Sequence, residues 1–220
     1  MLKADLHLHS GEDRTHHLKY SARKLIGEMA KQGFEVLALT LHKDVFYDKK
    51  VFDYAKKKGV LLIQGTEKFV EKKEVLIYNI TQKEADEIKT FDDLRKLKKK
   101  KDILVIAPHP YFLLGECLGK KLEENIDVFD AVEYSHFYLS WLNLNRKAVR
   151  ISKKYKVPMI GNSDIHHLKQ IGMTYSLIDS KKDMKSVFNA VRKRKVTIKT
   201  KPASLYYFVW KAFMTFFKLE

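Results

Sequence analysis

Cysteine is nearly absent from this sequence, because Cys117 is the only one among 220 residues. A single cysteine excludes a disulfide framework within the chain and fits a reducing compartment. It also leaves any metal site to histidine, aspartate and glutamate ligands. Long apolar runs are absent too, since no stretch reaches the roughly 18 residues that a membrane-spanning helix requires. With no signal peptide ahead of Asp5, we expect a cytoplasmic protein.

Acidic residues are scarce relative to basic ones: 27 Asp and Glu stand against 43 Lys and Arg, which gives a net charge of +16. Such a balance favours anionic partners, including phosphate esters, nucleotides, nucleic acid and acidic lipid surfaces. A lysine-rich composition that only serves solubility would give the same charge. The charge therefore does not identify the substrate.

Short apolar runs alternate with helical patterns along the chain, without a linker or repeat that would divide it. The runs typical of buried strands are 2–8, 34–40, 60–64, 75–80, 103–107, 128–134, 157–160, 174–178 and 196–200. The segments with helical periodicity are 21–32, 48–58, 91–100, 139–156 and 182–194. Ser21 is suited to cap the first helix and Gly33 to end it. This alternation predicts a single α/β domain of parallel strands, as a barrel or an open sheet.

The C-terminal segment 201–220 has an unusual density of aromatic residues between positions 205 and 217. Thirteen residues are too few to span a membrane. We expect this segment to form a helix that packs on the domain. A contact between two copies of the chain, or an anchor at a membrane surface, are the alternatives. The sequence does not indicate the oligomeric state.

The first strand ends in the sequence Asp-Leu-His-Leu-His-Ser, residues 5–10. Alternate residues on a strand point the same way, so His7 and His9 share one side while Leu6 and Leu8 share the other. Two imidazoles aimed at one small volume beside an apolar run favour a bound divalent metal. Two partly exposed histidines in a loop are the alternative explanation.

Other predicted strands are also followed by residues that can bind metal. In chain order, these residues are His42, Glu67, His109, Asp164 and His166. In a parallel α/β barrel the carboxyl ends of all strands meet at one face, where active sites lie. Ligand-type side chains at so many strand ends therefore predict one shared metal centre.

These motifs resemble those of the PHP (polymerase and histidinol phosphatase) family of metal-dependent phosphoesterases. The similar segments are Asp-Leu-His-Leu-His-Ser at 5–10, Ala-Leu-Thr-Leu-His at 38–42, Gly-Thr-Glu at 65–67, Pro-His-Pro at 108–110 and Gly-Asn-Ser-Asp-Ile-His at 161–166. They occur in the family's order and place a PHP-like domain over residues 1–200. The resemblance implies an irregular seven-stranded (β/α) barrel with two or three divalent ions, of zinc, manganese or iron.

The resemblance also implies which residues bind each ion. The ligands expected for the first ion are His7, His9, Glu67 and Asp164. Glu67 would bridge to a second ion held by His109, and His42 and His166 would hold a third. A further ligand for the third ion would come from Asp13, His16 or His17, of which we favour His17.

The sequence departs from the family pattern at two places. Leu41 replaces the aspartate of the family's Thr-Asp-His, which predicts the loss of a partner that orients His42. A family histidine expected near 71–75 is missing, and Glu74 is the candidate to replace it as a ligand. Two ions are therefore a firmer expectation than three. Glu133 and His136 follow the apolar residues 128–132 of the sixth predicted strand, where the family often has a glutamate and a polar partner.

The function implied by the resemblance is hydrolysis of a phosphate ester by a metal-activated water. The side chains implied in catalysis are His7, His9, Glu67, His109, Asp164 and His166. The expected substrate is a phosphorylated small metabolite or a nucleotide. A nuclease acting on RNA or DNA ends, a peripheral-membrane member of the same family and a non-catalytic binding module are the alternatives.

Overall fold

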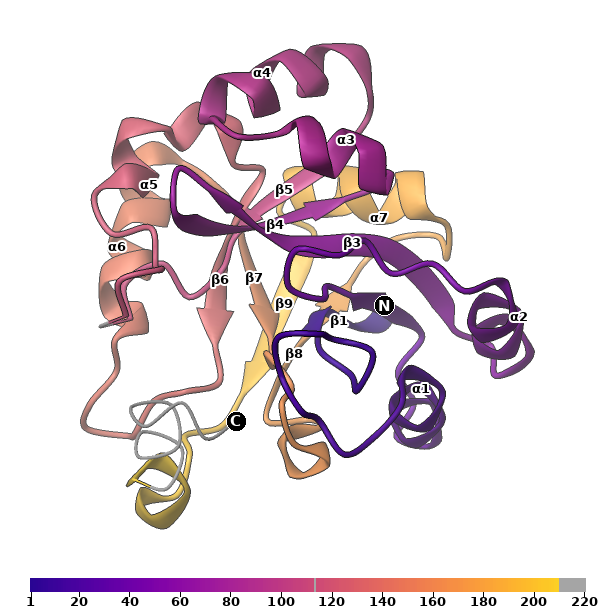
Figure 1. The fold of residues 1–220 in the computed structure, drawn as a ribbon. Coiled ribbons are helices and arrows are strands. Elements are labelled where there is room, and N and C mark those ends of the chain that lie inside the picture. The colour runs from indigo at the N-terminus through magenta and orange to yellow at the C-terminus, as the bar shows by residue number, and fades with distance from the viewer. Residues whose placement is uncertain (113, 210–220) are drawn as a thin grey trace.

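The computed structural model describes residues 1–112 and 114–209 (Figure 1). Its elements are, in chain order, β1 (Leu2–Leu8), α1 (Ala22–Lys31), β2 (Val36–Leu39), α2 (Lys49–Lys57), β3 (Leu61–Val70), β4 (Lys73–Tyr78), α3 (Gln82–Glu87), α4 (Phe91–Lys100), β5 (Leu104–Ala107), α5 (Lys121–Glu124), the 3-10 helix η1 (Ile126–Val128), β6 (Ala131–Ser135), α6 (Asn145–Tyr155), β7 (Met159–Asn162), the 3-10 helix η2 (Leu168–Gln170), β8 (Thr174–Ile178), α7 (Met184–Arg192) and β9 (Val196–Thr200). Every run predicted to be a strand overlaps an observed strand, and every predicted helix overlaps an observed helix. The short helices α3 and α5 were missed, because each is shorter than two helical turns.

The described strands form one sheet of nine, in the order β7-β6-β5-β4-β3-β2-β1-β8-β9. A count of seven strands is therefore not confirmed. The expectation of all-parallel pairing is wrong at two positions, since β4 and β8 run antiparallel to both of their neighbours. The cause at β4 is a tight hairpin: residues with positive φ at Glu71 and Lys72 turn the chain directly from β3 into β4.

The sheet curls until its two ends nearly meet. Beyond β7, Ile165 forms a parallel bridge with Leu8 at the end of β1, and the Ile165 carbonyl accepts a hydrogen bond from the His9 N–H at 3.3 Å. The Ser176 hydroxyl of β8 bonds both the N–H and the carbonyl of Gly161 in β7, each at 2.9 Å. The result is a nearly closed barrel that brings the ends of β1 and β7 together.

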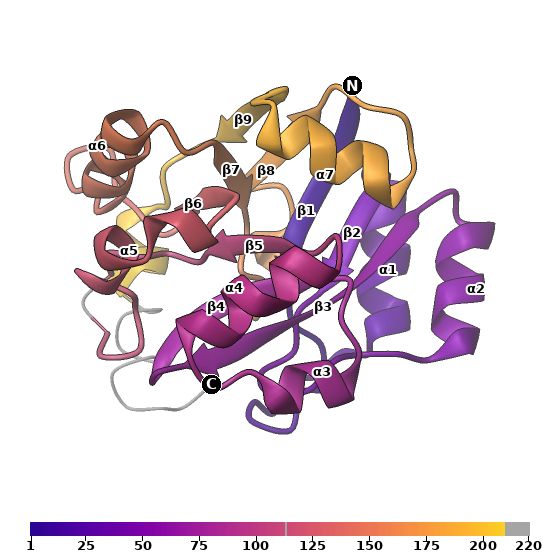
Figure 2. The same cartoon turned by 90° about the horizontal axis from the view of Figure 1, so that it is seen from above.

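Both faces of the sheet are buried, as the apolar runs predicted. In β2, Val36 and Ala38 pack in a cluster that includes α7, whereas Leu37 and Leu39 pack against α1. In β4 and β5, alternate residues divide in the same way between the α7 cluster and the cluster that contains α4. Helices α1 and α4 accordingly cover one face of the curled sheet, whereas α7 packs against residues of the opposite face (Figure 2).

The first helix begins and ends where the sequence predicted. The Ser21 hydroxyl accepts a hydrogen bond from the Lys24 N–H, which satisfies one of the unpaired donors at the start of α1. Gly33, with a φ of +78°, lies just beyond the helix in a conformation that favours glycine. These ends orient α1 against β2, beside the predicted metal ligands of β1.

The described part of the C-terminal segment is helical over residues 205–209. The Phe208 ring stacks on Phe137 with centroids 4.2 Å apart, and the Tyr207 hydroxyl lies 3.3 Å from His136 Nε2. Positions 210–217 of the predicted aromatic helix lie outside the described residues, so its full extent stays a prediction. Among residues 1–112 and 114–209, no helix is both long enough and apolar enough to cross a membrane.

Gly161 offers a test of how the barrel closes. A Cβ at this position would lie 2.6 Å from Ile198 Cγ2 and 3.1 Å from the Tyr175 carbonyl, so β7 could not keep its distance from β8 and β9. We expect Gly161→Ala to lower the free energy of unfolding by about 1–3 kcal/mol, as overpacking does. Urea unfolding measures this change. Gly115→Ala, where a Cβ meets nothing within 4 Å, is the control; equal midpoints for the two variants would contradict this account of closure.

Candidate metal centre

The two histidines of β1 lie deep inside the barrel. His7 and His9 are both fully buried, and their rings are 5.1 Å apart. Leu6 and Leu8 are buried as well, but they pack in different apolar clusters, and the pairing of β1 with β2 shifts register between Asp5 and Leu8. The alternative of two partly exposed loop histidines is therefore wrong.

A single carboxylate, Glu67, connects the histidines from two strands. Its Oε2 lies 3.1 Å from His7 Nε2, 3.2 Å from His9 Nε2 and 3.3 Å from His42 Nε2. Glu67 lies inside β3 rather than after its end, because pairing with β4 prolongs the strand to Val70. His42 is placed beside it by a parallel bridge between the two residues.

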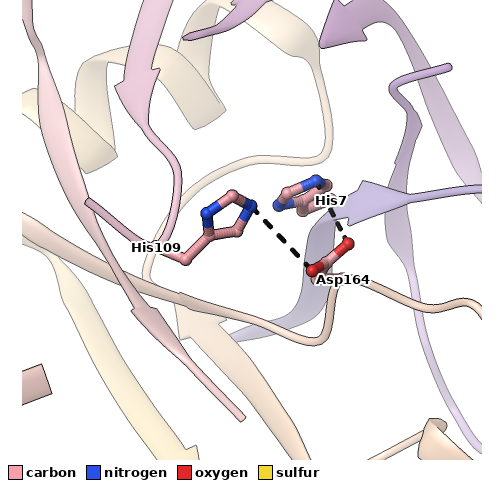
Figure 3. Close-up of side chains that lie close together, drawn as sticks. All are labelled: His7, His109 and Asp164. Carbon is pink, nitrogen blue, oxygen red and sulfur yellow. Dashed lines mark ion pairs between the residues drawn. The ribbon is translucent and has the colours of Figure 1, made fainter. Parts of the chain in front are cut away.

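Asp164 approaches the same volume from the loop after β7. Its Oδ1 lies 3.3 Å from His9 Nε2 and 3.5 Å from His7 Nε2, and its Oδ2 lies 3.9 Å from His109 Nε2 (Figure 3). The backbones of Asp164 and His109 have φ values of +47° and +23°, which non-glycine residues rarely adopt. Such conformations persist where the surroundings enforce them, and they are frequent at functional sites.

Carboxylates outside this group fix the orientation of its imidazoles. Glu133 Oε2 lies 2.9 Å from His7 Nδ1, and Asp13 Oδ2 lies 3.2 Å from His9 Nδ1 and 2.8 Å from His42 Nδ1. Because a carboxylate accepts hydrogen bonds, we assign the ring proton to Nδ1 in all three histidines. Each Nε2 then turns a lone pair toward Glu67, which is the arrangement of metal-binding histidines.

Two atoms in the centre of this group lack hydrogen bonds. His9 Nε2 and Glu67 Oε1 are both buried, and neither makes a hydrogen bond of good geometry. Unpaired buried polar atoms are costly, and such atoms in native structures indicate a bound ion or water. The nitrogen and carboxylate oxygen donors suit zinc, manganese or iron. The residues present therefore fit a divalent metal.

The charges of the centre compensate one another. Burial lowers the pKa of His9, but its contacts with Asp13 and two further carboxylates outweigh burial and raise that pKa to about 10. Burial raises the pKa of Asp164, but the imidazoles around it, led by His7, hold it well below its usual value. The pocket thus stabilises positive charge, in the form of either protons or a cation.

His16, rather than His17, lies beside the third predicted position. The His16 ring centroid is 4.6 Å from that of His42 and 4.9 Å from that of His166, whereas His17 is exposed to solvent. The preference for His17 is therefore not supported by the geometry. The predicted loss of an orienting partner for His42 is wrong, since Asp13 takes the role that Leu41 cannot.

The predicted ligand Glu74 lies beside His109, together with a residue that the sequence did not suggest. Glu74 Oε2 is 3.9 Å and Cys117 Sγ is 3.5 Å from His109 Nδ1. Burial, followed by the nearby charge of Glu67, raises the pKa of Glu74 to about 8. Cys117 was missed because it follows no strand: its loop returns to His109 only in the folded chain.

Comparisons with known proteins agree with this geometry. Residues 143–196 match the model of a family described as PHP-associated. An uncharacterized protein of Methanocaldococcus jannaschii is 27% identical over 142 residues, which cover 59% of this chain and 82% of the relative.

Two solved structures show the same fold. One is a two-domain protein of Bacteroides vulgatus said to contain a predicted PHP-like metal-dependent phosphoesterase: the TM-score is 0.66 at 20% identity, over 90% of this chain. This chain spans only 64% of the length of that protein. The other is PsfC of Pseudomonas syringae, with a TM-score of 0.68 at 13% identity, over 100% of this chain and 99% of PsfC. The family match over residues 143–196 and the shared fold agree with the motifs' resemblance to the PHP family of metal-dependent phosphoesterases.

Proposed function

We propose that this protein hydrolyses a phosphate ester of a small metabolite or a nucleotide, using divalent metal ions. The observation that supports the proposal is the common orientation of three imidazoles. His7, His9 and His42 are each held at Nδ1 by a buried carboxylate and each direct Nε2 toward Glu67. An interior of this kind is costly to fold unless it binds cations.

The side chains divide into positions for separate ions. The proposed ligands of the first ion are His7, His9, Glu67 and Asp164. Glu67 and His109 border a second position, and His42 and His166, with His16 beside them, border a third. When bound, divalent ions supply Lewis-acid stabilisation of phosphoryl oxygens and a water that is activated near neutral pH.

Side chains behind the ligands hold this arrangement in place. Asp5 is fully buried and accepts hydrogen bonds from the hydroxyl and the N–H of Ser163, the residue before Asp164. The Asn162 amide donates to Glu133 Oε2 at 3.0 Å, and the His109 N–H donates to Glu133 Oε1 at 3.3 Å. Glu133 therefore positions two ligands from different strands at the same time.

Removal of a ligand tests the proposal directly. We expect His9→Ala to abolish hydrolysis of a generic aryl phosphate and to reduce the bound metal measured by mass spectrometry, because the first ion loses one of its four proposed ligands. The barrel should stay folded by circular dichroism. His17→Ala, at an exposed neighbouring histidine, should keep both activity and metal. Hydrolysis that survives in a metal-free His9→Ala protein would refute the metal-dependent mechanism.

The positioning role of Glu133 is tested by an isosteric change. Glu133→Gln keeps the shape but leaves one acceptor oxygen where two were in use, so the orientation of His7 should loosen. We expect metal affinity to fall about 10–100-fold, as for other residues that orient metal ligands. Competition with a chelator measures the affinity, and Glu87→Gln at the surface is the control. Unchanged affinity would show that the Glu133 contacts are only structural.

The substrate class is tested with a panel of phosphorylated metabolites, nucleotides and short oligonucleotides. Turnover of small phosphate esters that varies little with salt would support the proposal. Cleavage of oligonucleotide ends that weakens steeply as salt rises would instead favour a nuclease, since contacts with many phosphates release counterions.

A further inference from the structure

Cys117, Glu74 and His109 form a group at the edge of the metal centre. The Cys117 Sγ and the Glu74 carboxylate both face Nδ1 of His109, at 3.5 and 3.9 Å, and the three ligand atoms all lie within 4.8 Å of one another. Around a tetrahedral zinc ion, with bonds of about 2.0–2.3 Å, ligand atoms are roughly 3.3–3.8 Å apart. The spacing in this group is therefore close to that required by one cation.

The backbone holds this group together. The Glu74 N–H donates to the Glu116 carbonyl at 2.9 Å, which fixes the residue before Cys117 against the start of β4. The Gly119 N–H donates to the Pro110 carbonyl at 2.8 Å, and this bond closes the loop that leads back to His109. Cys117 is only 3% exposed, so its thiol faces the interior rather than solvent.

The opposite edge of the His109 ring is consistent with a cation at Nδ1. A neutral imidazole binds one metal through one nitrogen, so binding at Nδ1 places the ring proton on Nε2. That nitrogen lies 3.5 Å from Glu67 Oε1, the buried oxygen that lacks a hydrogen bond. The proton would then point toward this oxygen, as carboxylates commonly orient metal-bound histidines.

We propose that Glu74, His109 and Cys117 bind a zinc-type cation through a carboxylate oxygen, an imidazole nitrogen and a thiolate. This inference rests on the proposed metal-dependent function, and it moves the second ion from the position between Glu67 and His109 Nε2 to the Nδ1 side of His109. As the metal–sulfur bond forms, the S–H bond breaks and its proton passes to solvent. A thiolate ligand favours zinc over manganese or magnesium. Three protein ligands leave one tetrahedral position for a water or substrate oxygen.

The single cysteine makes the test specific. The full chain, stripped of metal, is titrated with cobalt(II), and absorbance records the sulfur-to-cobalt charge-transfer band in the near ultraviolet. We expect the wild-type band to saturate at the intensity of one sulfur–cobalt bond per chain. In Cys117→Ser the preference for zinc over manganese should fall at least tenfold, whereas Glu74→Gln, which removes a carboxylate donor but keeps the thiolate, should weaken cobalt binding and retain the band. Glu116→Gln, at an exposed side chain beside Cys117, should retain the wild-type band and preference.

The outcomes separate this inference from the proposed function. Cobalt bound to the wild-type chain without a charge-transfer band would overturn the thiolate site and leave the other ligands in place. A preference for zinc over manganese that is equal in Cys117→Ser and the wild-type chain would also overturn the thiolate site. If the wild-type chain binds no cobalt or zinc at all, the proposed function fails together with the inference. Because the wild-type band needs no variant, the test remains decisive even if Cys117→Ser does not fold.

Discussion

The whole site depends on the compensation of buried charge. Glu67 is only 2% exposed, yet its carboxylate lies among imidazoles rather than among lysines or arginines. An isolated carboxylate in such a place would cost many kcal/mol or would take up a proton. Imidazoles compensate it only while they carry a proton or share a cation. Metal binding and the stability of this interior are therefore coupled.

The curled sheet makes this compensation feasible, because it brings distant residues to one place without long side chains. His7 and Asp164 are separated by most of the sequence, but the bridge between Leu8 and Ile165 brings their strand ends together. The hairpin of β3 and β4 extends the sheet past its parallel part and carries Glu74 to the far side of His109. Strand β4, whose antiparallel direction the sequence patterns did not predict, thus forms one wall of the site.

The sequence predicted well which candidate ligands lie close together where these residues follow periodic strands. His7 and His9 show the two-residue repeat of a strand, and His109 and Asp164 follow short runs of buried residues. It was less successful where placement depends on irregular loops. His16 and His17 are neighbours with the same chemistry, and only the course of the loop decides which one faces His42. Strand direction could not be predicted for a similar reason: strands joined by a hairpin turn and strands joined by a crossover have similar apolar runs.

The residue that replaces a missing aspartate shows how such sites tolerate change. The role of an orienting partner for His42 requires an acceptor at Nδ1, not a particular position in the chain. Asp13 provides that acceptor to both His9 and His42 from the loop after β1, so Leu41 is free to be buried among apolar neighbours. One carboxylate that serves two imidazoles also ties their orientations together. The proposed first and third ion positions would therefore share a common support, whereas the proposed Cys117 site is held by a different loop and would differ in its metal preference independently.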